Sequence, residues 1–290
     1  MIVVLGALVV LASVAGGFLM AGGHMHTLMH LSELVIIGGA AVGATIMMAP
    51  RKVLMALAGQ ILHVLKGTPY RRKSYEDLFM MLYELFLLGR RNGLIALEEH
   101  LTSPSTSAIF RRYHTVLQNR PAVEFLCGAL RPVIDGRVKP DQLRQLLEAD
   151  LDRMEEENHA PINVLTRAAD AMPGFGIVAA VLGIVITMAS ISGPIEQIGT
   201  KVAAALVGTF LGIFLGYGFL SPLAVNMEFN VVEQLAFFRC ISASVVSFAS
   251  GMAPGMAVEI ARRGLGEELR PGAEELEVML KALNANVAKK

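Results

Sequence analysis

The chain has 290 residues, of which 54% are hydrophobic and 17% are charged, and 25 basic side chains balance 25 acidic ones. Its mean hydropathy of +0.55 excludes a disordered chain and is too high for an ordinary soluble domain, in which about a quarter of the residues are charged. Balanced charge gives no basis for nucleic-acid binding, and two cysteines are too few for a disulfide framework. The composition predicts a membrane protein.

Charge divides the chain into two apolar and two charged segments. The apolar segments contain only three charged side chains, Glu33, Glu196 and Lys201. We expect a transmembrane hairpin, a helical cytoplasmic domain, a second transmembrane hairpin and a cytoplasmic helical tail. Their boundaries in this order are 1–50, 51–170, 171–227 and 228–290.

Each apolar segment is long enough for two spans, because about 20 residues at 1.5 Å each cross the hydrocarbon layer of a membrane. A helix satisfies its backbone hydrogen bonds within one segment, as a span requires. The expected spans are residues 2–21, 31–49, 173–192 and 202–227. The predicted fold class is therefore all-α, a polytopic membrane protein with four transmembrane helices and a helical cytoplasmic domain.

The orientation follows from the positive-inside rule. The segments 22–32 and 193–201 contain one lysine or arginine, Lys201, whereas Arg51 and Lys52 directly follow the second span. Lysine and arginine that flank a span stay on the cytoplasmic side. We therefore expect both charged segments and both termini in the cytoplasm and the two short loops outside.

The charged segments show helical periodicity. Apolar residues in 75–89 recur at the spacing of one helical face, and further helices are expected at 121–130 and 140–157. The last span should continue as a helix until Gly251 and Pro254 interrupt it. The sequence therefore predicts a helical bundle for the charged residues.

The sequence contains no nucleotide-binding P-loop, no HExxH or CxxC motif and no GxSxG elbow, so we expect neither enzymatic activity nor a bound cofactor. His24, His26 and His30 lie in or beside the first short loop at a spacing that could bind a metal. Three histidines without a carboxylate in register are more often incidental, and we predict no metal site.

No ionisable side chain lies in the central part of an expected span. Pumps and proton relays use such groups inside the membrane. Two alternatives therefore remain open: the chain does not conduct ions, or a partner inserts the titratable group.

Small residues line the last two spans. Gly208, Gly212 and Gly216 recur at every fourth position of the fourth span, and Gly176 pairs with Ala180 on the third. Residues of this size let helix backbones approach closely. The spacing indicates tight packing, either within one subunit or between subunits.

Two prolines and a threonine interrupt these apolar helices. We interpret Pro173 as the N-terminus of the third span, where proline costs little, and Pro222 as a kink or hinge within a continuous helix. The Thr209 hydroxyl either bonds its own backbone or faces a polar path in the bundle.

Three stretches resemble the MotA family of flagellar motor stator subunits. They are Leu34–Ala40 (LVIIGGA), Pro173–Gly183 (PGFGIVAAVLG) and the longest, Val207–Ala224 (VGTFLGIFLGYGFLSPLA). The likeness extends over almost the whole chain, including the order of the spans and the size of the charged segments.

The resemblance implies a stator subunit of the bacterial flagellar motor in the inner membrane, where it generates torque for motility and chemotaxis. It implies a proton channel formed with MotB, whose single membrane helix carries a titrating aspartate that this chain lacks. It also implies a homo-oligomer, a ring of five subunits around two MotB chains, that turns against the rotor switch protein FliG.

The resemblance also assigns roles to residues. Arg90 and Glu98 match the charges that face the rotor, Pro173 and Pro222 match prolines tied to coupling, and Thr209 matches a hydroxyl that lines the ion path.

The ion is a further prediction. Sodium-driven relatives typically carry a threonine where this chain has Ala180. A desolvated sodium ion needs oxygen ligands that a methyl group does not supply, and protons are therefore predicted.

Two other functions compete with this one. An energiser of outer-membrane processes resembling ExbB or TolQ would have three spans and no N-terminal hairpin. A non-conducting membrane scaffold would explain neither Thr209 nor the family resemblance.

Overall fold

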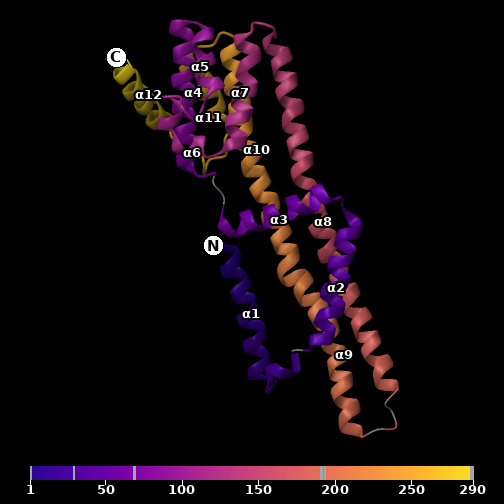
Figure 1. The fold of residues 1–290 in the computed structure, drawn as a ribbon. Helices are drawn as coiled ribbons and strands as arrows, with labels where there is room; N and C mark the ends of the chain where they lie inside the picture. Colours follow the sequence, from indigo (N-terminus) through magenta and orange to yellow (C-terminus); the bar gives the residue numbers. More distant parts are fainter. Residues whose placement is uncertain (1, 29, 68–69, 190–191, 193, 288–290) are drawn as a thin grey trace. The chain divides into compact units, whose positions relative to one another are not determined.

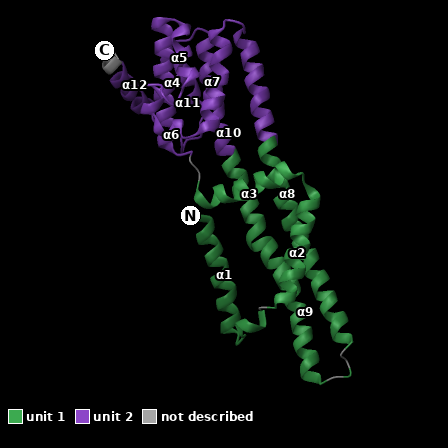
Figure 2. Cartoon of the chain, in the orientation of Figure 1, with its two compact units in different colours: residues 1–67, 157–231 green, residues 68–156, 232–290 purple. Residues whose placement is uncertain are grey.

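The computed structural model describes residues 2–28, 30–67, 70–189, 192 and 194–287. Every regular element within these ranges is a helix (Figure 1). The chain forms two compact units (Figure 2), which we call the membrane unit and the globular unit. The membrane unit comprises residues 1–67 and 157–231, and the globular unit comprises residues 68–156 and 232–290.

Four helices in the described ranges are long and apolar enough to cross a membrane, which confirms the predicted fold class. Three of them are α1, α2 and α8, and the fourth is formed by α9 and α10 with a π-helical turn between them. Their bounds are α1, Ile2–Met20; α2, Leu31–Met48; α8, Pro140–Met188; α9, Ile195–Leu215; the π turn, Gly216–Leu220; and α10, Ser221–Ala249. A 3₁₀ turn, Met25–Leu28, and α3, Arg51–Lys66, complete the membrane unit.

The membrane unit exposes many large apolar side chains. Leu5 and Leu8 on α1 are more than half exposed, as are Ile177 and Val185 on α8. In water this surface would be costly, but lipid tails are as apolar as these side chains. The exposure is what a structure that packs against lipid should show.

The third span does not begin at Pro173, so our interpretation of this residue was wrong. Helix α8 starts at Pro140 and continues through both Pro161 and Pro173 to Met188. The residues before Pro173 are good helix formers, and a membrane helix tolerates proline where a neighbouring helix compensates for the lost hydrogen bond.

The loop expected at 193–201 is also shorter than predicted. Helix α9 begins at Ile195, so Glu196 and Lys201 are helical. Glu196 lies in the first turn of α9, where the helix dipole favours an acidic side chain. Gly193, which we also assigned to this loop, lies outside the described residues.

The globular unit is a helical bundle around α4, which contacts α6, α11 and α12. The remaining described helices, listed with their bounds, are α4, Arg72–Asn92; α5, Glu98–Thr102; α6, His114–Leu117; α7, Arg120–Ile134; α11, Pro254–Arg263; and α12, Ala273–Val287. Two 3₁₀ turns, Leu94–Leu97 and Phe110–Arg112, connect them. The first part of α8 and most of α10 complete this unit.

Large side chains fill the core of the globular unit. Phe79 and Phe86 on α4 are fully buried, and Phe86 stacks on Phe248 of α10 with ring centroids 4.4 Å apart. Helix α10 ends at Ala249, and Gly251 takes a φ of +85° that favours glycine. The predicted interruption at Gly251 and Pro254 is thereby confirmed, because Pro254 begins α11.

Candidate functional site

The glycines of α9 form a seam with α8 inside the membrane unit. A Cβ atom on Gly212 would lie 2.6 Å from the Met172 carbonyl oxygen and 2.8 Å from the Gly176 Cα atom. A Cβ atom on Gly176 would lie 2.8 Å from the Gly208 carbonyl oxygen. The predicted close packing therefore occurs between two helices of one chain, and α8 and α9 run side by side in Figure 1.

Thr209 and Ala180 both lie at the seam. A Cβ atom on Gly208 would lie 3.4 Å from the Ala180 nitrogen, and one on Gly176 would lie 3.2 Å from the Thr209 Cα atom. Both residues are half-buried at the edge of the seam. Thr209 therefore lies beside Gly176, and Ala180 lies beside Gly208, one turn further along α8.

Pro173 lies beside the end of α9. Because proline has no N–H, the carbonyl of Ala169 loses its partner four residues along α8. Gly216 packs against this carbonyl: a Cβ atom on Gly216 would lie 2.8 Å from the Ala169 oxygen and 3.4 Å from the Pro173 Cδ atom. The glycine lets a Cα–H group approach the freed oxygen, which is a weak but favourable contact.

Pro222 lies in the first turn of α10, directly after the π turn Gly216–Leu220. In an α-helix its ring would clash with the carbonyl four residues earlier, that of Gly218. The wider turn relieves this conflict, and the Ser221 N–H bonds the Gly216 carbonyl instead. The helix is therefore continuous but irregular at the position where we predicted a kink or hinge.

Arg90 and Glu98 lie on exposed helix ends of the globular unit. Arg90 is in the last turn of α4 and donates a hydrogen bond to the Gly251 carbonyl, 3.1 Å away, while Glu98 begins α5. Each charge complements the dipole of its helix. Leu97 packs against Gly89, where a Cβ atom would lie 3.0 Å from the Leu97 Cδ1 atom, and this contact fixes α5 against the end of α4.

A buried ion pair supports the same bundle. Glu84 of α4 is buried and accepts hydrogen bonds from Arg112 at 2.7 Å and from the Tyr113 hydroxyl at 3.1 Å. Burial and the neighbouring Glu84 carboxylate raise the pKa of Tyr113. The tyrosine therefore stays a neutral donor, which leaves both oxygens of the buried carboxylate satisfied.

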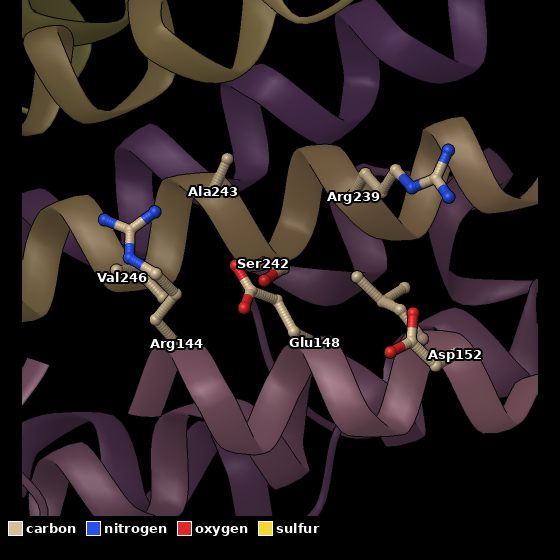
Figure 3. A pocket seen from close by; sticks show the side chains of 8 residues that line it. Arg144, Glu148, Asp152, Arg239, Ser242, Ala243 and Val246 are labelled. Atoms are coloured by element: carbon tan, nitrogen blue, oxygen red, sulfur yellow. The ribbon is translucent and has the colours of Figure 1, made fainter. Parts of the chain in front are cut away.

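A shallow groove of about 250 Å³ lies between the first part of α8 and α10 (Figure 3). Arg144, Glu148 and Asp152 point into it from α8, and Arg239 and Ser242 face them from α10. Its charges are of mixed sign and it has no activated nucleophile. We interpret it as a solvated polar interface between two helices.

Glu33 is a buried residue that the sequence pattern alone does not assign to a site. This residue lies in the first turn of α2 and is 6% exposed, and the Ser32 hydroxyl donates a 2.6 Å hydrogen bond to its carboxylate. Its place near the end of a span made it resemble an interfacial charge. The available signal was its spacing from Ile37 and Ala41, since the three residues form the buried face of α2.

The histidines near the first short loop do not gather into a site. His24 and His26 are exposed, and His30 is the residue before α2. Among the described residues, no group of three or more His, Cys, Asp or Glu side chains is placed to hold a metal ion.

Comparisons with known proteins cover nearly the whole chain. Residues 4–93 match the model of the motility protein A N-terminal region, and residues 117–237 match that of the MotA/TolQ/ExbB proton channel family. Motility protein A of Salmonella typhimurium is 37% identical over 98% of this chain and 96% of its own length. The chain belongs to the motility protein A family.

Other relatives agree with this membership. The chemotaxis protein LafT of Vibrio parahaemolyticus is 36% identical over 95% of this chain and 97% of its own length. The fold is similar to the C. jejuni MotAB structure, with a TM-score of 0.78, 20% identity and coverage of 93% of this chain and 98% of that one. The fold is also similar to the flagellar MotAB stator complex of Bacillus subtilis, with a TM-score of 0.74, 22% identity and coverage of 95% of this chain and 98% of that one. As a motility protein A, the chain is an inner-membrane stator subunit of the flagellar motor.

Proposed function

We propose that this chain forms an ion-driven stator with a MotB-like subunit whose single membrane helix carries an aspartate. The observation that carries the proposal is the α8–α9 seam, in which the backbone of Thr209 lies beside Gly176 and the backbone of Ala180 lies beside Gly208. The partner carboxylate would reach its ion-binding position beside Thr209. MotAB complexes among the similar structures support a partner of this kind.

The transported ion in this proposal is the proton. The Thr209 hydroxyl can bond a carboxylate in either protonation state, whereas the Ala180 methyl group offers a desolvated sodium ion no ligand. Protonation of the partner carboxylate removes a large desolvation cost and lets its helix rest against a different subunit face. Each transfer would thereby advance the ring by one step.

Torque would pass through the exposed edge that carries Arg90 and Glu98. In this proposal the globular unit is cytoplasmic, five copies of the chain surround two MotB-like chains, and rotation presents successive edges to FliG. Two observations support this role. Both charges are exposed, and the contact between Leu97 and Gly89 holds the start of α5, which carries Glu98, against the end of α4, which carries Arg90. Arg51 and Lys52, which directly follow α2, support this orientation because both are exposed and basic residues that flank a span stay in the cytoplasm.

Replacing the motor's own MotA and MotB with this chain and its cognate single-span partner tests the function. We expect rotation to be restored only when both are present. Rotation without the partner would contradict the proposal, as would speed that follows a sodium gradient rather than a pH gradient in matched cells.

Charge reversal tests the rotor edge. Arg90→Glu should reduce swimming severalfold without lowering the amount of protein in the membrane, because the hydrogen bond it loses is exposed and contributes only about 1 kcal/mol. Arg91→Glu, at a neighbour that is also exposed, is the matched control. Partial rescue by a reversed charge on FliG would support direct contact. Normal torque after reversal of both Arg90 and Glu98 would contradict it.

A further inference from the structure

Glu33 is a carboxylate buried in the membrane unit of this chain. Its exposed fraction is 6%, and it shares the buried face of α2 with Ile37 and Ala41, one and two turns further along the helix. An acidic residue in the first turn stabilises a helix by its interaction with the helix dipole, and this interaction does not require the residue to be buried. Burial adds a desolvation cost that this stabilising role does not require.

The neighbours of Ile37 locate Glu33 along the seam. Ile37 lies in one apolar cluster with Met172 and Ala179 of α8. The Ala179 methyl group in turn faces Gly208, where an added Cβ atom would be 3.1 Å away. Glu33 is one turn of α2 nearer the first short loop than Ile37. Glu33 therefore lies on the face of α2 that packs against α8 and α9, one helical turn from Ile37 toward the first short loop.

The surroundings leave the carboxylate weakly compensated. Among the described residues, Ser32 is the hydrogen-bond partner that the structure gives it. The charged or titratable groups on the elements that pack against this part of α2 are Glu196 and Lys201 of α9 and the loop residues His24, His26 and His30. Lys201 has interactions of its own. A carboxylate in a membrane segment without a buried cation beside it is a typical proton-binding group.

We infer that Glu33 takes up the transported proton at the outer entry of the ion path, before the partner subunit's carboxylate receives it. The proton moves from the outer solution to the Glu33 carboxylate and then to the partner's acid near Thr209, and Glu33 returns to its ionised form. The inference rests on the proposed function. It adds a proton-binding residue from this chain to a path whose main acid comes from the partner.

The test compares Glu33→Gln with the wild-type chain in cells whose own stator genes are deleted and that express the cognate partner. Rotation speed is measured against external pH at constant load, and membrane levels are checked by immunoblotting. Loss of the carboxylate should reduce the local proton supply about tenfold, which moves the half-maximal speed to an external pH about one unit lower. Speed should therefore fall at neutral pH and recover in acid.

Ser32→Ala separates this role from a structural one, because it keeps the carboxylate and removes a hydrogen bond that favours its ionised form. Protonation becomes easier, and the half-maximal speed should move to a higher external pH, opposite to the shift in Glu33→Gln. Glu33→Asp and Glu33→Asn have side chains of equal length, one with a carboxylate and one without. Comparing them repeats the test, so that it does not depend on the folding of a single variant. A wild-type midpoint in the Gln and Asn variants, or a loss of speed by the same factor at every pH, would overturn the inference. Failure of the wild-type chain to restore rotation would overturn the proposed function itself.

Discussion

The two units of this chain obtain their tight packing in opposite ways. In the membrane unit the closest contacts are between backbones, because Gly176, Gly208 and Gly212 leave no side chain between α8 and α9. In the globular unit the closest contacts are between large side chains, such as the stacked rings of Phe86 and Phe248. One chain therefore contains two packing strategies.

The difference follows from the two solvents. In water, removing a large apolar side chain from solvent supplies most of the stability, and bulky residues are favoured in the core. In lipid this driving force is absent, and dispersion between closely approaching backbones replaces it. The globular unit should therefore be most sensitive to lost volume and the membrane unit to added volume.

Lost volume in the globular unit should have the largest effect. Phe86→Ala leaves a cavity beneath Phe248 and should destabilise α4 by about 3–5 kcal/mol, which hydrogen exchange of the α4 amides in the full chain would measure. Ile177→Ala on α8 is the matched control, since this side chain is 57% exposed and its loss should change stability by less than about 0.5 kcal/mol. Similar losses in both units would refute the comparison.

Added volume in the membrane unit should have the next largest effect. Gly→Ala inside a helix ordinarily stabilises it, by about 0.5–1 kcal/mol. Gly212→Ala should instead destabilise the α8–α9 pair by about 1–3 kcal/mol, because the new methyl group would overlap the Met172 carbonyl. Gly199→Ala on the same helix meets no atom within 4 Å and is the control. Hydrogen exchange of the α8 and α9 amides should become faster in Gly212→Ala and slower in Gly199→Ala.

Acid should have a smaller effect, confined to the globular unit. Hydrogen bonds from Arg262 and then Arg263 lower the pKa of Glu259 from 4.5 to about 2. A lowered carboxyl pKa contributes stability that is complete above the unfolded value and is lost as pH falls toward the folded one. Exchange protection of α11 should therefore decline between about pH 4.5 and pH 2. In Glu259→Gln this part of the decline should be absent; an unchanged profile would contradict the assignment.

The family motifs and charge pattern predicted the four spans, the small-residue ridge and the interruption at Gly251. They failed at Pro173, where local propensity favours a helix start but Gly216 on the next helix stabilises a continuous one. They also missed Glu33, because the sequence gives its position near the end of a span but not which face of α2 is buried.

The sequence by itself determined which segments are surrounded by lipid and which by water, because the length of an apolar segment and its lack of charge decide whether it enters the membrane. It also determined the helices, because lipid requires every backbone group to be satisfied locally. The tertiary structure alone decided that the glycine ridge packs within the chain, that Thr209 and Ala180 lie in one seam, and that Glu33 faces inward. These outcomes depend on contacts between residues far apart in sequence, which no local pattern encodes.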